Sequence, residues 1–141
     1  MSTSLKQQFL DLFADLKSSH PLFARMETTI EASPWHREAN VLVHTTMVVN
    51  EYVKLVDAAL ADTSTADWSR ADYLGALACA FHDVGKPKSE IQKWSESRGN
   101  YRAYHGHEQV SARLFENYAC SHNLGLTAHE IFSIAWMIEH H

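Results

Sequence analysis

The sequence predicts an all-α fold, a helical bundle of five or six helices with a small irregular hairpin or loop around residues 88–104. Apolar residues recur at spacings of three and four along most of the chain, which is the period of an amphipathic helix. Chain breakers such as Ser33-Pro34 and Gly125 stand between these periodic runs. With 45% hydrophobic and 21% charged residues, the 141-residue chain has the composition and length of one folded domain.

The first half of the chain predicts three helices. Leu5–Leu16 carries an amphipathic stripe, and a short second helix over Leu22–Ala32 ends at Ser33-Pro34, because a residue before proline is driven out of the helical region. A long third helix is expected from about Glu38 to Leu60. Its core-facing stripe is expected to consist of Val41, His44, Val48, Tyr52 and Leu55.

A fourth helix is expected to run to Phe81. Asp67 or Ser69 is its N-cap, since either side chain can accept a hydrogen bond from the first turn. Gly85 and Pro87 follow its last turn and end it. Helical periodicity is then absent until residue 104.

Two helices complete the predicted bundle. The segment before them contains Ser97–Asn100, which has the composition of a turn. The first of these helices runs from about His105 to His122. Thr127 and Glu130 have the spacing of a capping box for the last one, which continues to the end of the sequence.

Composition excludes several classes of protein. No apolar run approaches the roughly 20 residues of a membrane span, and the N-terminus lacks the pattern of a secretory signal, so a cytoplasmic protein without a membrane partner is expected. Cys79 and Cys120 lie in apolar helical patterns and are expected to be buried free thiols. The net charge of −5 argues against a surface that coats nucleic acid. Residues 84–104 are an exception: five basic and two acidic residues give them a charge of +3.

The ten histidines carry most of the chemical information. His44 lies in an apolar stripe, His82 and Asp83 end a helix, and His107 opens another. Singly, each has an ordinary interpretation as a satisfied core or surface residue. Together with a histidine pair on the last helix, four helices bring imidazoles toward the interior, and burying several imidazoles without partners is costly. A shared metal cluster satisfies them together, with Asp83 bridging two cations.

These residues match the pattern of a known family. Phe81–Pro87, which reads Phe-His-Asp-Val-Gly-Lys-Pro, resembles the signature of the HD phosphohydrolase superfamily. His44 is similar to the family's first histidine, and His107 in Tyr104–Glu108 to its third. His140-His141 resembles the paired histidines of a later helix. The resemblance implies a single HD domain over 1–141, with a helical lead-in at 1–33 and a metal-site core at 34–141.

A closer resemblance is to the HD domains of RNA-end enzymes, namely CCA-adding tRNA nucleotidyltransferases and the HD domain fused to a bacterial polynucleotide kinase. Trp35–Val41 and Gly106–Glu108 carry this resemblance. It implies a metal-dependent phosphohydrolase or phosphodiesterase that uses a water activated by two metals. The substrate would be a nucleotide or RNA-end phosphate, either a 3′-phosphate or a 2′,3′-cyclic phosphate. A fused or associated kinase or ligase would be the partner, and the oligomeric state is not predicted.

The resemblance implies two divalent transition-metal ions, from among Mn, Ni, Co, Fe and Zn, with Mg as a further option. His44, His82 and Asp83 would hold one ion. Asp83, His107 and His140, together with His141, would hold the second. Asp83 and Lys86 are the expected catalytic residues, with the Lys86 ammonium on a phosphate oxygen; its alternative role is a charge that favours a helix C-terminus.

The expected substrate contacts surround this centre. The basic residues of the 84–104 segment and the histidines next to the metal motifs are the candidates, namely Lys86, Lys88, Arg98, Arg102, His105 and His36. The aromatic residues of the segment are expected either to stack on a base or to cover the core, namely Trp94, Tyr101 and Tyr104. Glu108 either orients an imidazole or serves as a helix N-terminal charge.

One departure from the family is expected to matter. The family has a further Asp on a helix after the paired histidines, and no Asp follows His141 here. The expectation is either a chain lacking a C-terminal helix or another group in that place; His140-His141 as tag residues is a further alternative. Two other functions stay open: an HD-type di-iron oxygenase, and a non-catalytic module that binds nucleotides or RNA ends.

Overall fold

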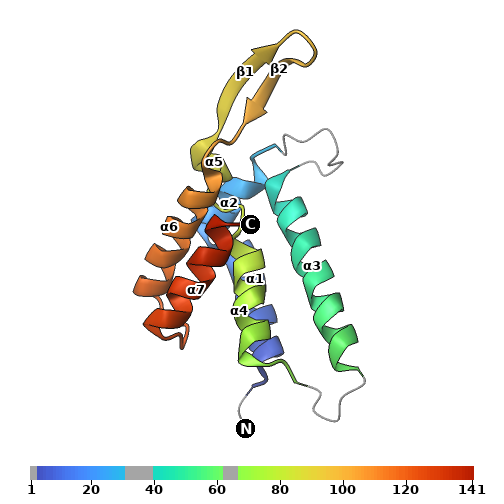
Figure 1. Cartoon of the computed structure of the whole chain (residues 1–141), viewed down its shortest axis with the longest axis vertical. Coiled ribbons are helices and arrows are strands. Elements are labelled where there is room, and N and C mark those ends of the chain that lie inside the picture. The colour runs from blue at the N-terminus through green and yellow to red at the C-terminus, as the bar shows by residue number, and fades with distance from the viewer. Residues whose placement is uncertain (1–2, 31–39, 62–66) are drawn as a thin grey trace.

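The computed structural model describes residues 3–30, 40–61 and 67–141. Over these ranges the chain is mostly helical, with one two-stranded sheet, which confirms the predicted helical class (Figure 1). The helices are α1 (Leu5–Ser19), α2 (Pro21–Glu27), α3 (Val41–Leu60), α4 (Arg70–Phe81), α5 (Lys86–Ser89), α6 (His107–Ser121) and α7 (Ala128–Glu139). The strands are β1 (Ile91–Ser95) and β2 (Gly99–Ala103).

Side-chain caps fix where the main helices begin. Ser69, not Asp67, caps α4, and its side chain forms a reciprocal capping box with Asp72. Thr127 and Glu130 form the predicted capping box of α7. The start of α3 is set by Asn40, whose Oδ1 accepts a hydrogen bond of 2.9 Å from the third residue of the helix.

Helix α4 is the centre of the bundle. It packs against α1, α3, α6 and α7, and it lies between α3 and α7 in Figure 1. Its last residue, Phe81, is fully buried and meets the rings of Phe23 and Phe115 at centroid distances of 5.4 and 5.1 Å. Each such aromatic pair stabilises the fold by about 0.5–1.5 kcal/mol beyond the contribution of the buried apolar area. The two residues that follow, His82 and Asp83, are thereby anchored to the core.

The segment that lacked helical period forms a regular antiparallel hairpin rather than an irregular one. Ile91 pairs with Ala103 and Ser95 with Gly99, so residues 96–98 make a three-residue turn. Gly99 has a φ of +66°, a conformation that favours glycine at this place in a hairpin. The hairpin projects beyond the helices (Figure 1). Because neither face of the hairpin packs on the core, its sequence needs no alternation of apolar and polar residues. Even the large apolar side chain of Trp94 is 66% exposed.

Several boundaries differ from the sequence expectation. Helix α2 ends at Glu27, five residues early, and α6 begins at His107 because Gly106 has a left-handed φ of +74°. The boundary expected at 33–34 lies outside the described residues. Cys79 and Cys120 are free, as expected, but Cys120 is exposed, so its predicted burial was wrong.

The buried face of α3 agrees with the predicted stripe only in part: Val41 is buried as predicted, and Tyr52 packs against the core. Val41, Thr45 and Val49 point into the core, whereas Leu55 is 70% exposed. The apolar residues of α3 span a wider arc than one core-facing stripe, and the packing on α4 covers only part of it. No helix in the described ranges has both the length and the apolarity to cross a membrane.

An ion pair joins the first turns of α4 and α7. The guanidinium of Arg70 donates to both carboxylate oxygens of Glu130, with distances of 2.7 and 2.9 Å, and also to the carbonyl of Gly125. The hydrogen bond from Arg70 is the largest cause that lowers the pKa of Glu130, from 4.5 to about 2. The ionised form is therefore the one that stabilises the fold.

Replacing Glu130 with Gln is expected to lower the free energy of unfolding by about 0.5–1 kcal/mol at pH 7, since Gln keeps the capping geometry but loses the charge. Because the folded pKa lies below the unfolded value of 4.5, this contribution is complete above pH 4.5 and is lost toward pH 2. Urea unfolding of both proteins at pH 7 and pH 2.5 measures the difference. A difference that stays the same at both values would contradict the assignment.

Candidate metal centre

Asp83 is a buried carboxylate in the tight turn after α4. It is 2% exposed, although the residue carries a charge. The backbone of the turn is held by hydrogen bonds from Val84 N to the carbonyl of Phe81 and from Lys86 N to the carbonyl of Asp83, with distances of 3.2 and 3.1 Å. A buried charge needs partners to offset its loss of hydration. The partners come from five helices or their ends, α3, α4, α5, α6 and α7.

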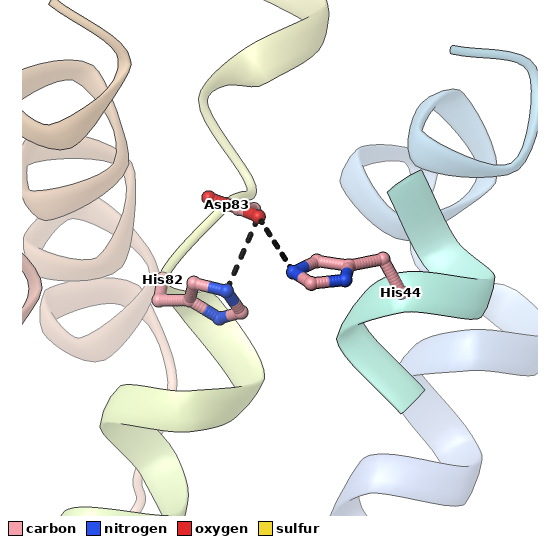
Figure 2. Close-up of side chains that lie close together, drawn as sticks. All are labelled: His44, His82 and Asp83. Carbon is pink, nitrogen blue, oxygen red and sulfur yellow. Dashed lines mark ion pairs between the residues drawn. The ribbon is translucent and has the colours of Figure 1, made fainter. Parts of the chain in front are cut away.

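Five nitrogen atoms lie within 4 Å of the two oxygens of Asp83. Oδ2 is 3.1 Å from Nε2 of His82 and 3.8 Å from Nε2 of His44, and these two rings face it from α3 and the end of α4 (Figure 2). Oδ1 is 3.1 Å from Nε2 of His107 and 3.6 Å from Nε2 of His141. Lys86 Nζ lies 3.2 Å from Oδ2. We call the four histidines and Asp83 the Asp83 cluster.

The other ring nitrogen of three of these histidines is hydrogen-bonded to a backbone carbonyl. Nδ1 of His82 lies 2.6 Å from the carbonyl of Cys79, and Nδ1 of His107 lies 3.0 Å from that of Tyr104. Nδ1 of His141 contacts the carbonyl of Ile138 at 2.5 Å. A carbonyl only accepts, so each Nδ1 carries the proton. In the neutral imidazole, Nε2 is then a lone pair aimed at Asp83.

This arrangement requires cations between the rings and the carboxylate. An imidazole lone pair and an ionised carboxylate are both acceptors, so they repel each other at 3.1 Å unless a proton or a metal ion lies between them. Backbone carbonyls that fix the Nδ1 proton are the usual outer support of metal-binding histidines. The donor set therefore fits a metal ion, with protons as the occupants when metal is absent.

Two groups of donors have the spacing of a metal site. His44, His82 and Asp83 form one, and Asp83, His107 and His141 the other, with the donor atoms of each group within 4.8 Å of one another. An ion with ligand bonds of about 2.0–2.1 Å needs donors about 3.3–3.5 Å apart in tetrahedral geometry. The distances from the Asp83 oxygens to the four histidine Nε2 atoms range from 3.1 to 3.8 Å, which includes this value. The buried Asp83 carboxylate and the partly exposed imidazoles around it can thus hold a metal ion.

Contacts within the cluster shift the pKa values of Asp83 and His141. Burial raises the pKa of the Asp83 carboxyl, but hydrogen bonds from His107, His141 and His82 outweigh burial and hold the pKa well below its ordinary value. The hydrogen bond to Asp83 is also the largest cause that raises the pKa of His141. The carboxylate therefore stays ionised, and His141 retains a proton to higher pH when no metal competes for it.

Gly85 sets the distance between the Asp83 turn and α6. Its N–H donates to the Oγ of Ser111, which is buried, at 2.8 Å. A Cβ on Gly85 would lie 2.6 Å from Ser111 N and 2.8 Å from the carbonyl of His107. Only glycine allows this approach, which brings His107 to Asp83. Sequence reasoning missed Ser111, and its one signal was a small polar residue inside an apolar helical run.

The two C-terminal histidines separate. His141 joins the Asp83 cluster, whereas His140, the expected main ligand of the second ion, is exposed and stacks on the ring of Trp136 at 4.4 Å. Helix α7 ends at Glu139, so the backbone of the next residue has left the helical path. The structure therefore exchanges the expected roles of the two neighbours.

The remaining expected site residues lie around the cluster or away from it. Glu108 Oε1 is 3.5 Å from His107 Nδ1, beside the ligand imidazole. Lys88 and His105 are exposed. In the hairpin region, the guanidinium of Arg98 lies over the ring of Tyr101. Arg102 forms an ion pair with Glu90 at 3.0 Å. Of the other two aromatic candidates, Trp94 is exposed and Tyr104 is buried. His36 and Trp35 lie outside the described residues.

Replacing His141 with Ala is expected to weaken the binding of divalent metal at its group by at least about 10-fold, because one of three donors is lost and loss of even an outer supporting group costs that much. Replacing the adjacent His140 with Ala should leave metal affinity within about twofold, since that ring faces Trp136. Isothermal titration with Mn²⁺ and Zn²⁺ measures both. Equal losses in the two variants would contradict the placement of these rings.

Metal affinity is expected to rise with pH until His141 has lost its proton, above the ordinary histidine pKa of 6.5, by about tenfold per pH unit for that proton. The reason is that a metal ion displaces the proton of His141, whose pKa is raised chiefly by its hydrogen bond to Asp83. Titrations in buffers of different ionisation enthalpy count the protons released. Binding without proton release would show that the imidazoles are not the ligands.

In comparisons with known proteins, no family model, no curated protein and no solved structure matches this chain. The chemistry of the Asp83 cluster is therefore the basis for assigning a function.

Proposed function

We propose that this protein is an HD-type, metal-dependent phosphohydrolase or phosphodiesterase that acts on a nucleotide or RNA-end phosphate. The observation that carries the proposal is the shared carboxylate: Asp83 faces His44 and His82 with one oxygen, and His107 and His141 with the other. A carboxylate that bridges two groups of imidazoles is suited to a pair of divalent ions. The order of these residues in the chain is that of the HD superfamily.

The types of ligand atom limit which metal ions suit the site. Four imidazoles and one carboxylate favour divalent transition metals such as Mn, Ni, Co, Fe or Zn over Mg, which prefers oxygen ligands. Such a pair of ions supplies Lewis acidity, which polarises a phosphoryl oxygen and makes a neighbouring water more acidic. The chain's own contribution is to hold the donors in place through the carbonyls of Cys79, Tyr104 and Ile138.

Lys86 provides a fixed positive charge at the centre. Its side chain is 11% exposed, and its ammonium lies beside Asp83 and 5.6 Å from the ring centroid of Tyr104. A buried cation next to the metal groups favours an anionic substrate, because Coulomb attraction is screened less away from bulk water. We assign Lys86 the binding of a phosphate oxygen, in exchange for or alongside its contact with Asp83.

The basic segment after the cluster supports an RNA end as substrate. Residues 84–104 carry a net charge of +3, against −5 for the whole chain. Lys88 and His105 are exposed near the two ends of the hairpin that follows α5. We assign to these residues, with Arg98 and Arg102, contacts to the rest of the nucleotide or to neighbouring phosphates.

Replacing Asp83 with Asn is expected to lower metal-dependent phosphate release by more than about 100-fold, because both donor groups lose their common charge. The assay uses nucleotides with a 3′-phosphate or a 2′,3′-cyclic phosphate, with Mn²⁺, Ni²⁺ or Co²⁺ added. Asp11→Asn is the matched control, since Asp11 is exposed and its carboxylate accepts a hydrogen bond from the exposed Gln7. Its activity should equal that of the unmodified protein.

Two results would overturn the proposal. Iron-specific consumption of dioxygen without phosphate release would identify a di-iron oxygenase. Nucleotide or RNA-end binding that needs no metal and is unchanged in His82→Ala and Asp83→Asn would identify a non-catalytic module.

A further inference from the structure

The Asp83 cluster opens into a groove beside α3. A hollow of about 450 Å³ lies between α3 and α4, and His44 is one of its lining residues. A second hollow of about 240 Å³ adjoins it, since both are lined by Val48 and Cys79. His82 and His141 line the second hollow. We call the two hollows together the α3 groove; three of the four imidazoles of the cluster border it.

The walls of the α3 groove are apolar and exposed. Met47 and Leu55, two helical turns apart on α3, are 50% and 70% exposed, and both line the larger hollow. Val48 and Met137 add further apolar surface. Large apolar side chains that remain exposed in a concave site indicate a binding surface. Its continuity with the metal groups indicates that the ligand reaches both.

The α3 groove also selects on charge. Among the described side chains that line it, Glu51 is the only charged one apart from the imidazoles. Its carboxylate lies 3.3 Å from Lys54 and is 69% exposed. Away from the imidazoles of the cluster, a phosphate in the groove would find one carboxylate and no cation among the described lining residues. An anionic group therefore belongs at the cluster, beside Lys86, and an uncharged group belongs in the groove.

We propose that the α3 groove binds an uncharged planar ring of the substrate, either a nucleobase or an aryl group, while the phosphate of the same molecule lies at the Asp83 cluster. This inference rests on the proposed function and adds the substrate class to it. A volume of about 450 Å³ falls within the range of small-molecule sites. The thioether of Met47 and the ring of Tyr52 offer favourable contacts to a π-face. Glu51 can accept a hydrogen bond from a ring N–H.

The first test measures binding without any reaction. 1-Naphthol is an uncharged planar probe, and its fluorescence reports binding to the metal-free protein. Saturable binding is expected, and Met47→Glu and Leu55→Glu should each weaken it by at least about tenfold by placing a charge against the ring. Ile30→Glu is the matched control, because Ile30 is 50% exposed and lines neither hollow of the groove. The control should bind as the unmodified protein does.

The second test compares two phosphate esters in the metal-loaded protein. Met47→Glu and Leu55→Glu are expected to lower kcat/KM for 1-naphthyl phosphate by at least about tenfold, and to change kcat/KM for methyl phosphate by less than about threefold. The change caused by each variant is the readout, since naphtholate is intrinsically the better leaving group. Circular dichroism and sedimentation confirm that the variants are folded and have the same oligomeric state as the unmodified protein.

The outcomes separate this inference from the proposed function. Phosphate release that is unaffected by the groove variants, together with absent 1-naphthol binding, would overturn the groove assignment and leave the hydrolase proposal standing. Saturable 1-naphthol binding without any metal-dependent phosphate release would support the groove as a ring-binding site and remove the hydrolase proposal. A change of oligomeric state in Met47→Glu or Leu55→Glu alone would show that a second copy covers the groove, which would overturn the inference.

Discussion

The arrangement of the Asp83 cluster follows from one electrostatic constraint. A carboxylate that is 2% exposed must be offset, and its two oxygens face the Nε2 atoms of four histidines. Three of those histidines have their Nδ1 proton fixed on a backbone carbonyl. Acceptors therefore face acceptors, and cations must lie between them. Protons satisfy this need in the metal-free protein, and metal ions can replace them.

The fold serves this constraint by bringing distant parts of the chain to one turn. Phe81 fixes the turn in the aromatic core, and the approach of Gly85 to Ser111 fixes the start of α6 against it. The capping boxes and the Arg70 ion pair set where α4 and α7 begin. Since each imidazole comes from a different element, the packing of the helices determines the distances between the donor atoms. A change in the core is expected to alter metal affinity as well as stability.

The helical class and most candidate ligands could be predicted because both depend on local sequence patterns. Periodicity and capping residues give the helices, and an imidazole in an apolar stripe gives a buried donor, as with His44. The exchange of His140 and His141 could not be predicted, because the helix ends one residue before the pair and the periodic pattern no longer fixes direction. Because the apolar residues of α3 span a wide arc, the sequence alone predicts that Leu55 faces the core, whereas tertiary packing buries Thr45 and leaves Leu55 exposed.

The most direct test of the shared carboxylate is anomalous diffraction from crystals of the protein soaked in Mn²⁺. The account predicts two peaks about 3.5–4 Å apart, one on each side of the Asp83 carboxylate, with His44 and His82 at one and His107 and His141 at the other. A peak remote from Asp83, or a well-ordered cluster with no anomalous density at saturating Mn²⁺, would contradict it.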